Sequence, residues 1–385
     1  MITNCPTCQS SKLGTFLEQK EIPTNSYLML RDQDQALSYP TGNMALTLCD
    51  DCGYIFNAAF IPDNTEYSES YEASQGSSKV FMAWLEVMAA EFVKRNDLQG
   101  KTIFEVGCGQ GEFLAMATRA SGGKGIGIDP AYKPGFIDEK DALNLEFIND
   151  FFNESTPQIS FDAIAHRHTL EHIIDVAPHS NLVLQAAAKN EAKVFFELPE
   201  MKRILTDLAF WDIYYEHCNY FTPGSLSRLL RSQGLGVTHL ATEYDDQYCC
   251  LEGVMGEKTE ILPLEDDLDE VKKLVDQFSI NFPKQMEELG NTVSEFSKPI
   301  IWGAGSKGTS FLTNLGLGMN ELGLVVDIDK HKHGTFMAKT GQPVQGPDAL
   351  IEYQPDLVVA MNSIYLDEIQ ADLDSRGVNA KLIGV

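Results

Sequence analysis

The sequence predicts an α/β protein of three parts: a small N-terminal four-cysteine domain, a central doubly wound domain, and a C-terminal Rossmann-like domain. Three observations lead to this prediction. Two C-x2-C pairs stand near the N-terminus, and two glycine-rich turns, at 107–111 and 303–308, each follow a short apolar strand and precede a helix. A strand, a glycine turn, a helix and a second strand ending in an acid open a nucleotide-binding sheet. We expect the domains to span 1–66, 67–255 and 256–385.

Composition and charge narrow the class of protein. The 385 residues are enough for two or three domains, and a hydrophobic content of 43% is ordinary for a globular protein. No apolar run reaches the roughly 18 residues that a membrane span requires, and the N-terminus lacks a basic and then apolar signal. We therefore expect a cytoplasmic protein. The net charge of −27 repels nucleic acid and anionic membranes, so neither is an expected partner.

The N-terminal cysteines have the spacing of a metal site. Cys5 and Cys8 form one C-x2-C pair, and Cys49 and Cys52 form the second. Two such pairs complete a closed shell of four thiolates around a structural zinc ion, with no open position for catalysis. Disulfides are the alternative, but the lack of a secretion signal argues against an oxidising compartment. Between the pairs we expect a small sheet built from the extended pieces SYLML (26–30) and MALTL (44–48).

A polar and aromatic segment at 57–78 leads into a helix expected at about 79–95. This segment is long enough to reach over the next domain, and it contains Tyr71. A tyrosine in a linker has a functional phenol only if it points into a cleft. From the residues alone, packing and function remain equally open for it.

The central domain begins with the segment 101–129, which contains Gly107, Gly109 and Gly111. Glycines let the backbone turn sharply and approach a ligand, and the helix that follows presents free N–H groups. Asp129, at the tip of the second strand, stands where an acid accepts the hydroxyls of a ribose. The spacing G-x-G-x-G, with Glu105 two residues before it, differs from the dinucleotide form G-x-G-x-x-G. A tight turn that binds nothing is the alternative.

Polar residues also stand at the ends of the later strands of this domain. The third strand, LEFI, ends at Asp150 and Phe151, where an adenine would lie. The fourth, FDAIAHRH, ends at Arg167 and His168, and the fifth, KVFFELP, carries Glu197. Doubly wound sheets bind ligands at this carboxyl edge.

An irregular segment at 210–223, FWDIYYEHCNYFTP, crowds several titratable side chains together. Tyr214, Glu216 and His217 stand between its aromatic ends. A histidine with an orienting carboxylate or phenol is suited to general base catalysis, because its pKa is easily tuned toward neutral pH. A capping loop for the helix that begins near Pro223 is the alternative.

The C-terminal part starts with a charged helical region at about 257–296, read as a pair of linker helices interrupted near Pro283. A strand then enters the turn GAGSKG at 303–308, which has the G-x-G-x-x-G spacing, with Asp327 about 20 residues further on. Only about 90 residues follow Lys298, roughly one mononucleotide-binding half. A bound dinucleotide, a phosphate-positioning module and a purely structural domain therefore remain open.

Together the three parts resemble the sugar C-methyltransferase family of deoxysugar biosynthesis, across nearly the whole chain. The G-x-G-x-G turn resembles the first motif of class I S-adenosylmethionine-dependent methyltransferases. The family's I-Y-x-E-H segment matches 213–217, its L-x-H-I segment matches 170–173, and its tyrosine before a serine-containing loop matches Tyr71 with Ser74. The resemblance implies that a nucleotide-linked 4-keto sugar is methylated on carbon through an enolate, with His217 as base and Tyr214 as partner of the substrate oxygen.

The motifs and the resemblance together give three sets of candidate residues besides the four cysteines. The catalytic set is His217, Tyr214, Glu216, His172 and Tyr71. The S-adenosylmethionine set is Glu105, Gly107, Cys108, Gly109, Gly111, Phe113, Asp129, Asp150, Phe151, Arg167 and His168. The substrate set is Glu197, Gly303, Gly305, Ser306, Lys307, Gly308 and Asn362.

Other functions remain open at this stage. Methylation of oxygen or nitrogen on another activated sugar or polysaccharide precursor is the first alternative, in which His217 would deprotonate a hydroxyl or an amine. A binding or scaffold protein that keeps the fold without the activity is the second. We expect a small-molecule substrate and a monomer or small homo-oligomer.

Overall fold

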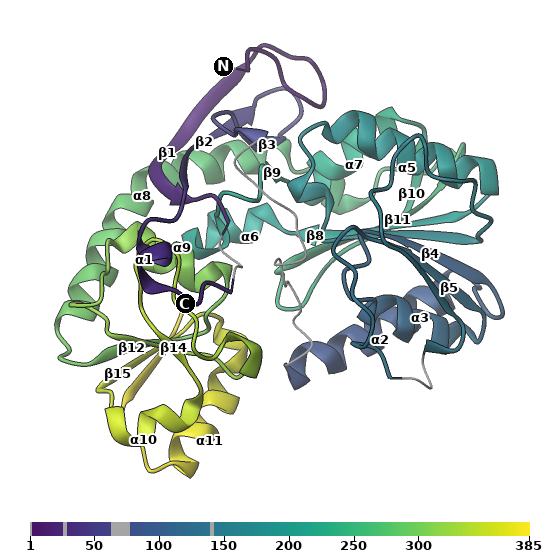
Figure 1. Cartoon of the computed structure of the whole chain (residues 1–385). Coiled ribbons are helices and arrows are strands. Elements are labelled where there is room, and N and C mark those ends of the chain that lie inside the picture. The colour runs from purple at the N-terminus through teal and green to yellow at the C-terminus, as the bar shows by residue number, and fades with distance from the viewer. Residues whose placement is uncertain (1, 26–28, 63–77, 139–141) are drawn as a thin grey trace.

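In the computed structural model, described for residues 2–25, 29–62, 78–138 and 142–385, the named strands form three sheets (Figure 1). The N-terminal sheet has four strands, the central sheet seven and the C-terminal sheet five. The predicted α/β class with two Rossmann-like sheets is confirmed. No helix of the described ranges is both long and apolar enough to cross a membrane.

The N-terminal sheet has the order β1-β2-β3-β9. Its elements are β1 (Leu13–Pro23), α1 (Gln33–Leu37), β2 (Thr41–Cys49), β3 (Ile55–Asn57) and β9 (Asn219–Tyr220). The expected strand at 26–30 was wrong for residues 29 and 30, which lie outside any strand, and 26–28 lie outside the described residues. The missed strand β1 alternates charged residues such as Glu18 and Lys20 with buried Leu17 and Gln19, so its polar composition hid it.

The central sheet has the order β10-β11-β8-β7-β4-β5-β6, in which β11 is antiparallel to both neighbours. Its strands are β4 (Thr102–Val106), β5 (Lys124–Ile128), β6 (Leu145–Ile148), β7 (Ala163–Arg167), β8 (Lys193–Pro199), β10 (Leu235–Glu243) and β11 (Tyr248–Met255). Its helices are α2 (Lys79–Arg95), α3 (Glu112–Ser121), α5 (Val176–Asn190), α6 (Met201–Thr206) and α7 (Pro223–Ser232), with the short turns η2 (Leu170–His172) and η3 (Phe210–Asp212). Helices α5 and α7 cover one face and α2 and α3 the other (Figure 1). Because both faces are covered, strands such as β7 are buried along their whole length.

The C-terminal sheet is all parallel, with the order β14-β13-β12-β15-β16. Its strands are β12 (Pro299–Trp302), β13 (Leu324–Val326), β14 (Val344–Gln345), β15 (Leu357–Ala360) and β16 (Lys381–Gly384). Its helices are α9 (Ser306–Leu315), α10 (Leu350–Tyr353) and α11 (Leu366–Ser375), with the turns η5 (Lys330–Lys332), η6 (Pro347–Ala349) and η7 (Ser363–Tyr365). The length of this part predicted a single mononucleotide-binding half, but the sheet has five strands. The extra strands fit into the same length because β13, β14 and β16 are very short.

One long helix, α8 (Leu268–Ser294), follows the turn η4 (Pro263–Glu265) and joins the central and C-terminal sheets. The predicted pair of helices interrupted near Pro283 was wrong, because the helix continues through this proline. Aromatic residues of the turn just before this proline pack against other elements: Phe278 meets Phe16 of β1 at 6.1 Å, and Phe282 meets Phe210 at 5.8 Å, between ring centroids. This packing offsets the roughly 3 kcal/mol that an interior proline costs a helix.

The N-terminal residues share their cores with the rest of the chain. Cys5, Cys49 and Tyr54 belong to one buried cluster with Phe221 and Leu226 of the central part. Leu17 and Ile22 of β1 belong to another, which continues through α8 into the C-terminal sheet. The four-cysteine part is therefore fixed against both of the larger units.

Candidate functional site

The first glycine turn connects β4 to α3 and requires glycine for two separate reasons. Gly107, Gly109 and Gly111 have φ values of +70°, +54° and +90°, a region that side-chain-bearing residues rarely adopt. At Gly107 a Cβ would also overlap the Thr169 hydroxyl, which comes from the end of β7. The turn therefore packs closely under the carboxyl edge of the sheet while α3 directs its N-terminus at the same place.

Asp129, at the end of β5, fixes the shape of this turn. Its carboxylate accepts hydrogen bonds from the backbone N–H of Gly109, at 2.9 Å, and of Ala131, at 2.7 Å. Burial raises the pKa of Asp129, and these two N–H groups lower it in part. Each oxygen keeps a lone pair, so the carboxylate can still accept hydroxyl groups from a ligand.

A cavity of about 420 Å³ opens over this turn. Candidates from both the cofactor and the catalytic sets line it: Glu105, Gly107, Cys108, Gly109, Phe113, Asp129, Phe151, Arg167, His168, His172, Tyr214 and His217. Residues that meet here come from five regions of the chain, since the carboxyl ends of neighbouring strands share one edge of the sheet. This volume is within the range of small-molecule sites.

The segment 210–220 forms one wall of this cavity and is anchored at both ends. At its start, the Ser310 hydroxyl of α9 donates to the carbonyl oxygens of Phe210, at 3.1 Å, and Ile213, at 2.8 Å. At its end, β9 pairs with β3 of the N-terminal sheet. His217 lies between these anchors, with its ring centroid 4.1 Å from that of Tyr214 and 4.7 Å from that of His172.

A second cavity, of about 1300 Å³, lies over the C-terminal glycine turn. It is lined by Gly303, Gly305, Ser306, Lys307, Gly308 and Asn362, all members of the substrate set. A Cβ at Gly308 would overlap the Gly303 carbonyl, so this glycine allows α9 to pack against the strand, as the dinucleotide fingerprint requires.

The two cavities meet. Tyr214, Tyr248, Ser306 and Lys307 line both of them. The Lys307 ammonium group lies 3.0 Å from an Asp212 oxygen and 3.0 Å from Oε1 of Gln247, so a residue of the C-terminal turn contacts two segments of the central domain. The site can therefore hold one ligand over the first turn and a longer ligand that extends over the second.

Comparison with known proteins places this geometry in a family. Residues 80–240 match a methyltransferase domain, and residues 268–383 match the C-terminal domain of C-methyltransferases. The C-methyltransferase NovU of Streptomyces niveus is 24% identical over 361 residues, which cover 89% of this chain and 85% of NovU. The chain is a class I S-adenosylmethionine-dependent C-methyltransferase.

The methyltransferase is also similar to solved structures over the central part of its chain. The 1,6-didemethyltoxoflavin-N1-methyltransferase of Burkholderia thailandensis is 12% identical, with 46% of this chain and 82% of that chain covered and a TM-score of 0.37. The magnesium protoporphyrin IX methyltransferase of Synechocystis PCC 6803 is 13% identical, with 47% and 86% covered and a TM-score of 0.37.

The cavity over the first turn fits the charge of S-adenosylmethionine. Glu105 lines this cavity, and its Oε2 atom is buried without a hydrogen-bond partner among the described residues. Burial raises the pKa of Glu105 to about 8, although Arg167 lowers it in part. A buried carboxyl oxygen that has no hydrogen-bond partner among the described residues is suited to face a positively charged ligand. Together with Asp129 and the three glycines, Glu105 would hold the cofactor in the methyltransferase.

Arg167 and Glu197 were predicted in different sets, but the structure joins them. The guanidinium group binds both oxygens of Glu197, at 2.7 and 2.8 Å, and lies 4.6 Å over the Phe113 ring. Nε2 of His168 lies 2.8 Å from the same carboxylate. Glu197 is fully buried and lines neither cavity, so it lies behind Arg167 and His168 and not at the cavity surface.

The protonation of the histidines differs across the site. Burial lowers the pKa of His168, but Glu171 and Glu197 raise it further, to about 9, so this ring is an imidazolium at neutral pH. Burial lowers the pKa of His172, which Glu171 raises only in part. Burial, His172 and His168 lower the pKa of His217 well below its usual range. His172 and His217 are therefore neutral near pH 7.

Several predicted residues lie apart from the cavity. Asp150 does not line it, and its Oδ1 accepts the N–H of Phe151 instead. Gly111 shapes the turn but does not line the cavity. Glu216 is buried and does not line the cavity either. Tyr71 and Ser74 lie outside the described residues.

Sequence analysis missed other lining residues. Asp212, Gln247 and Tyr248 line the cavity, and Glu171 stands among its histidines. Asp212 is in the segment 210–223 but was not singled out. Gln247 and Tyr248 come from the turn before β11 and its first residue, and no motif marks them, because only the pairing of β11 with β8 brings them to this edge.

The four N-terminal cysteines form a second cluster, away from both cavities. Their sulfur atoms lie within 4.8 Å of one another, with 3.7 Å between Sγ of Cys5 and Cys52 and 3.6 Å between Sγ of Cys8 and Cys49. Four thiolates at about 2.3 Å from a zinc ion are about 3.8 Å apart, so the cluster has the size of a tetrahedral site. None of the four cysteines lines either cavity.

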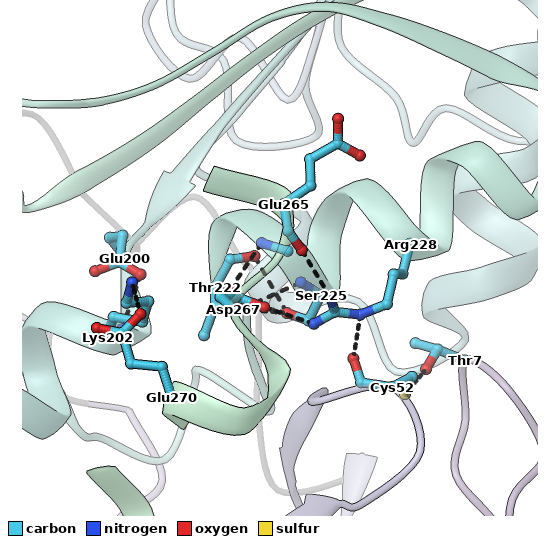
Figure 2. Close-up of polar contacts among 11 residues, drawn as sticks. Thr7, Cys52, Glu200, Lys202, Thr222, Ser225, Arg228, Glu265, Asp267 and Glu270 are labelled. Carbon is cyan, nitrogen blue, oxygen red and sulfur yellow. Dashed lines mark hydrogen bonds and ion pairs between the residues drawn. The ribbon is translucent and has the colours of Figure 1, made fainter. Parts of the chain in front are cut away.

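The knuckle that contains Cys52 is bound to the methyltransferase domain through Arg228 of α7 (Figure 2). Nε of Arg228 donates to the Cys52 carbonyl at 2.8 Å, and its NH2 group binds Asp267 at 2.7 Å. Asp267 also accepts the N–H of Gly224 at 2.9 Å. One arginine thus connects the metal knuckle, α7 and the start of α8.

Proposed function

We propose that this methyltransferase transfers a methyl group to a carbon atom beside the keto group of a nucleotide-linked deoxysugar. The observation that carries the proposal is the joining of the two cavities at Tyr214, Tyr248, Ser306 and Lys307. A methyl donor over the first turn and a substrate that reaches to the second would meet at His217. The name of the relative NovU supports carbon as the acceptor atom.

The chemistry of carbon methylation explains the polar groups at this junction. Carbon is a poor nucleophile, so a C–H bond beside a carbonyl must first lose its proton to a base. His217 is neutral and can take this proton, and the phenol of neighbouring Tyr214 can donate to the enolate oxygen. S-adenosylmethionine, when bound, supplies the methyl group on a positively charged sulfur.

The second glycine turn is suited to the nucleotide end of such a substrate. The N-terminus of α9 begins at Ser306, and Lys307, Lys330, Lys332 and Arg376 line the same cavity. Free N–H groups at a helix N-terminus and nearby cations together bind phosphate. This local set of donors would meet a diphosphate in spite of the net charge of −27.

We also propose that the cysteine cluster holds a structural zinc ion, on the sulfur spacing given above. The ion would have four protein ligands and no position for substrate.

The proposal is tested by mass spectrometry of the protein incubated with S-adenosylmethionine and a panel of nucleotide-linked sugars. The panel contains keto sugars with their 4-hydroxy and 4-amino counterparts. We expect a gain of one methylene mass on a keto sugar only. A gain on the hydroxy or amino sugar would replace the proposal with O- or N-methylation, and no gain on any sugar, with the cofactor bound, would discard the substrate class.

Deuterium exchange separates carbon from oxygen and nitrogen acceptors. Without the methyl donor, the enzyme should wash solvent deuterium into the carbon beside the keto group, because enolate formation precedes transfer. His217→Ala should lose this exchange and lower turnover by about 100-fold or more, with cofactor binding intact. His239→Ala, on β10 away from both cavities, is the matched control. Unchanged turnover in His217→Ala would remove His217 from the mechanism.

A further inference from the structure

A buried carboxylate stands among three histidines of the site. Glu171, in η2, is 2% exposed, and neither of its oxygens has a hydrogen-bond partner among the described residues. One oxygen lies 3.6 Å from Nδ1 of His168. A carboxylate oxygen of Glu171 and one ring nitrogen each of His172 and His217 lie within 4.8 Å of one another. An ionised group in such a position interacts strongly with the rings around it, because little water screens it.

The hydrogen bonding of His172 fixes which of its nitrogens can accept a proton. Its Nδ1 lies 2.9 Å from the backbone carbonyl oxygen of Glu216, which can only accept, so Nδ1 carries the hydrogen. In the neutral ring, Nε2 therefore holds the lone pair. His217 is also neutral, and its Nδ1 is buried without a hydrogen-bond partner among the described residues. Both rings are in the form that accepts a proton.

Glu171 is the last member of a chain of alternating charges. Arg167 binds Glu197 at 2.7 Å, Glu197 binds His168 at 2.8 Å, and His168 faces Glu171 at 3.6 Å. His168, whose pKa Glu171 and Glu197 raise, is therefore an imidazolium with a carboxyl group on each side. This series of charged groups extends from β7 and β8, beside the cavity over the first glycine turn, to the histidines of the catalytic set.

Several weak acids also lie near Glu171 and the two histidines. The Cys218 thiol donates to the Glu171 backbone carbonyl at 3.5 Å, and burial raises its pKa to about 12. Tyr214 lies 4.1 Å and Tyr220 lies 6.2 Å from the His217 ring, between centroids. Burial raises the pKa of Tyr220 well above its usual value. Cys218 and Tyr220 therefore stay neutral near pH 7.

We propose that Glu171 is the counter-ion of the base: a positioning residue that stabilises the imidazolium formed when the His172–His217 pair takes the proton from the substrate carbon. The C–H bond breaks, its proton moves to a ring nitrogen, and its electron pair passes into the enolate. The inference rests on the proposed function, and it gives Glu171 a charged role beside the orienting role that the sequence left open between Glu216 and Tyr214.

The first test needs no substrate. The ring of His172 is titrated by NMR in the full-length protein, with S-adenosylhomocysteine bound, in wild type and in Glu171→Gln. A carboxylate favours the charged form of a nearby imidazole, so its removal should lower the pKa of His172 by about one unit. Asp175→Asn, an exposed carboxylate four positions along the same loop, should leave it unchanged. A pKa that is unchanged or higher in Glu171→Gln would overturn the inference.

The second test uses the reaction. Glu171→Gln should lower the plateau of kcat/KM by about 10- to 100-fold and move its acid limb to lower pH, because the base becomes weaker. Glu171→Asp keeps the charge and should keep the acid limb near its wild-type position. Cofactor affinity, measured by calorimetry, should stay within about threefold in both variants. A lower plateau with an unmoved acid limb in Glu171→Gln would mean a merely structural role.

The two tests separate the failure of this inference from the failure of the proposed function. A wild-type protein that neither exchanges deuterium into a keto sugar nor methylates it would refute the proposed function, while the titration of His172 would still decide the pairing with Glu171. If the enzyme methylates keto sugars and Glu171→Gln leaves the pKa of His172 unchanged, only the inference is refuted.

Discussion

The side-chain amide of Asn219 donates a hydrogen bond of 2.9 Å to the carbonyl oxygen of Leu170. It donates a second one, of 2.6 Å, to the carbonyl of Ile173, and its own oxygen accepts from the buried Tyr54 phenol. Asn219 thus fastens the segment that contains His217 to the turn that contains His172. Because β9 pairs with β3, the N-terminal sheet also holds both of these segments in place.

Replacing Asn219 should therefore damage both folding and catalysis. Asn219→Ala removes the described partners of the buried Tyr54 phenol and the Ile173 carbonyl, while the Leu170 carbonyl keeps the Ile173 N–H, and we expect a loss of about 3 kcal/mol in the free energy of unfolding. Tyr54→Phe removes only one of these hydrogen bonds and should cost about 1 kcal/mol. Urea denaturation measures both. Equal losses in the two variants would show that Asn219 does not hold the turn as described.

The fold could be predicted from the sequence where local chemistry determines the backbone. The glycine turns at 107–111 and 303–308 were found because a positive φ, or the close approach of Gly308 to Gly303, requires glycine. The pairs of cysteines were found because two C-x2-C pairs are typical of a metal site, and their four sulfur atoms do lie together. Strand β1 was missed, and Pro283 was read as a break, because partners distant in sequence decide both.

The site was predictable only in part for the same reason. His172, Tyr214 and His217 stand in crowded polar segments, and they do meet around one cavity. The pairing of Arg167 with Glu197 depends on the register of β7 and β8, which no local pattern shows. Glu171 looks like an ordinary polar residue of a short turn until His168, His172 and His217 are placed around it.

Removal of the metal should destabilise the whole protein. The wild-type chain should contain about one zinc ion, measured by plasma mass spectrometry, and Cys49→Ser should lose it. Cys250→Ser, at a buried cysteine outside the cluster, should keep its zinc. A chelator should lower the Tm of the wild type and leave that of Cys49→Ser unchanged. A Cys49→Ser protein that keeps a full equivalent of zinc would contradict the assignment.

Lys307 should matter for the sugar substrate more than for the cofactor. Burial lowers its pKa and Asp212 raises it again in part, so Asp212 supports the charge of a buried lysine at the junction of the cavities. Lys307→Met should raise KM for the nucleotide sugar by about 10- to 100-fold, the range of a charged hydrogen bond. Cofactor affinity should change by less than about threefold. Lys298→Met, directly before β12 and outside both cavities, is the control. An equal loss of affinity for the nucleotide sugar and for the cofactor would contradict the assignment of Lys307 to the sugar substrate.

Binding of the cofactor should release a proton from Glu105. With its pKa raised to about 8 by burial, this carboxyl group is mostly protonated in the free protein at pH 7. A positively charged ligand in the cavity favours the ionised form, so binding at pH 7 should release about 0.5 to 0.9 proton per cofactor. Calorimetry in buffers of different ionisation enthalpy measures this number.

The raised pKa of Glu105 also makes the stability of the folded protein depend on pH. The folded protein holds this proton more tightly than the unfolded chain does. Glu105 therefore does not lower the free energy of unfolding below about pH 4, and it lowers it progressively as the pH rises toward 8. Glu105→Gln should therefore raise the Tm of the cofactor-free protein at pH 8 more than at pH 5, and it should bind the cofactor without releasing a proton. Glu86→Gln, on the exposed side of α2, should change neither result. Proton release that persists in Glu105→Gln would assign it to another group.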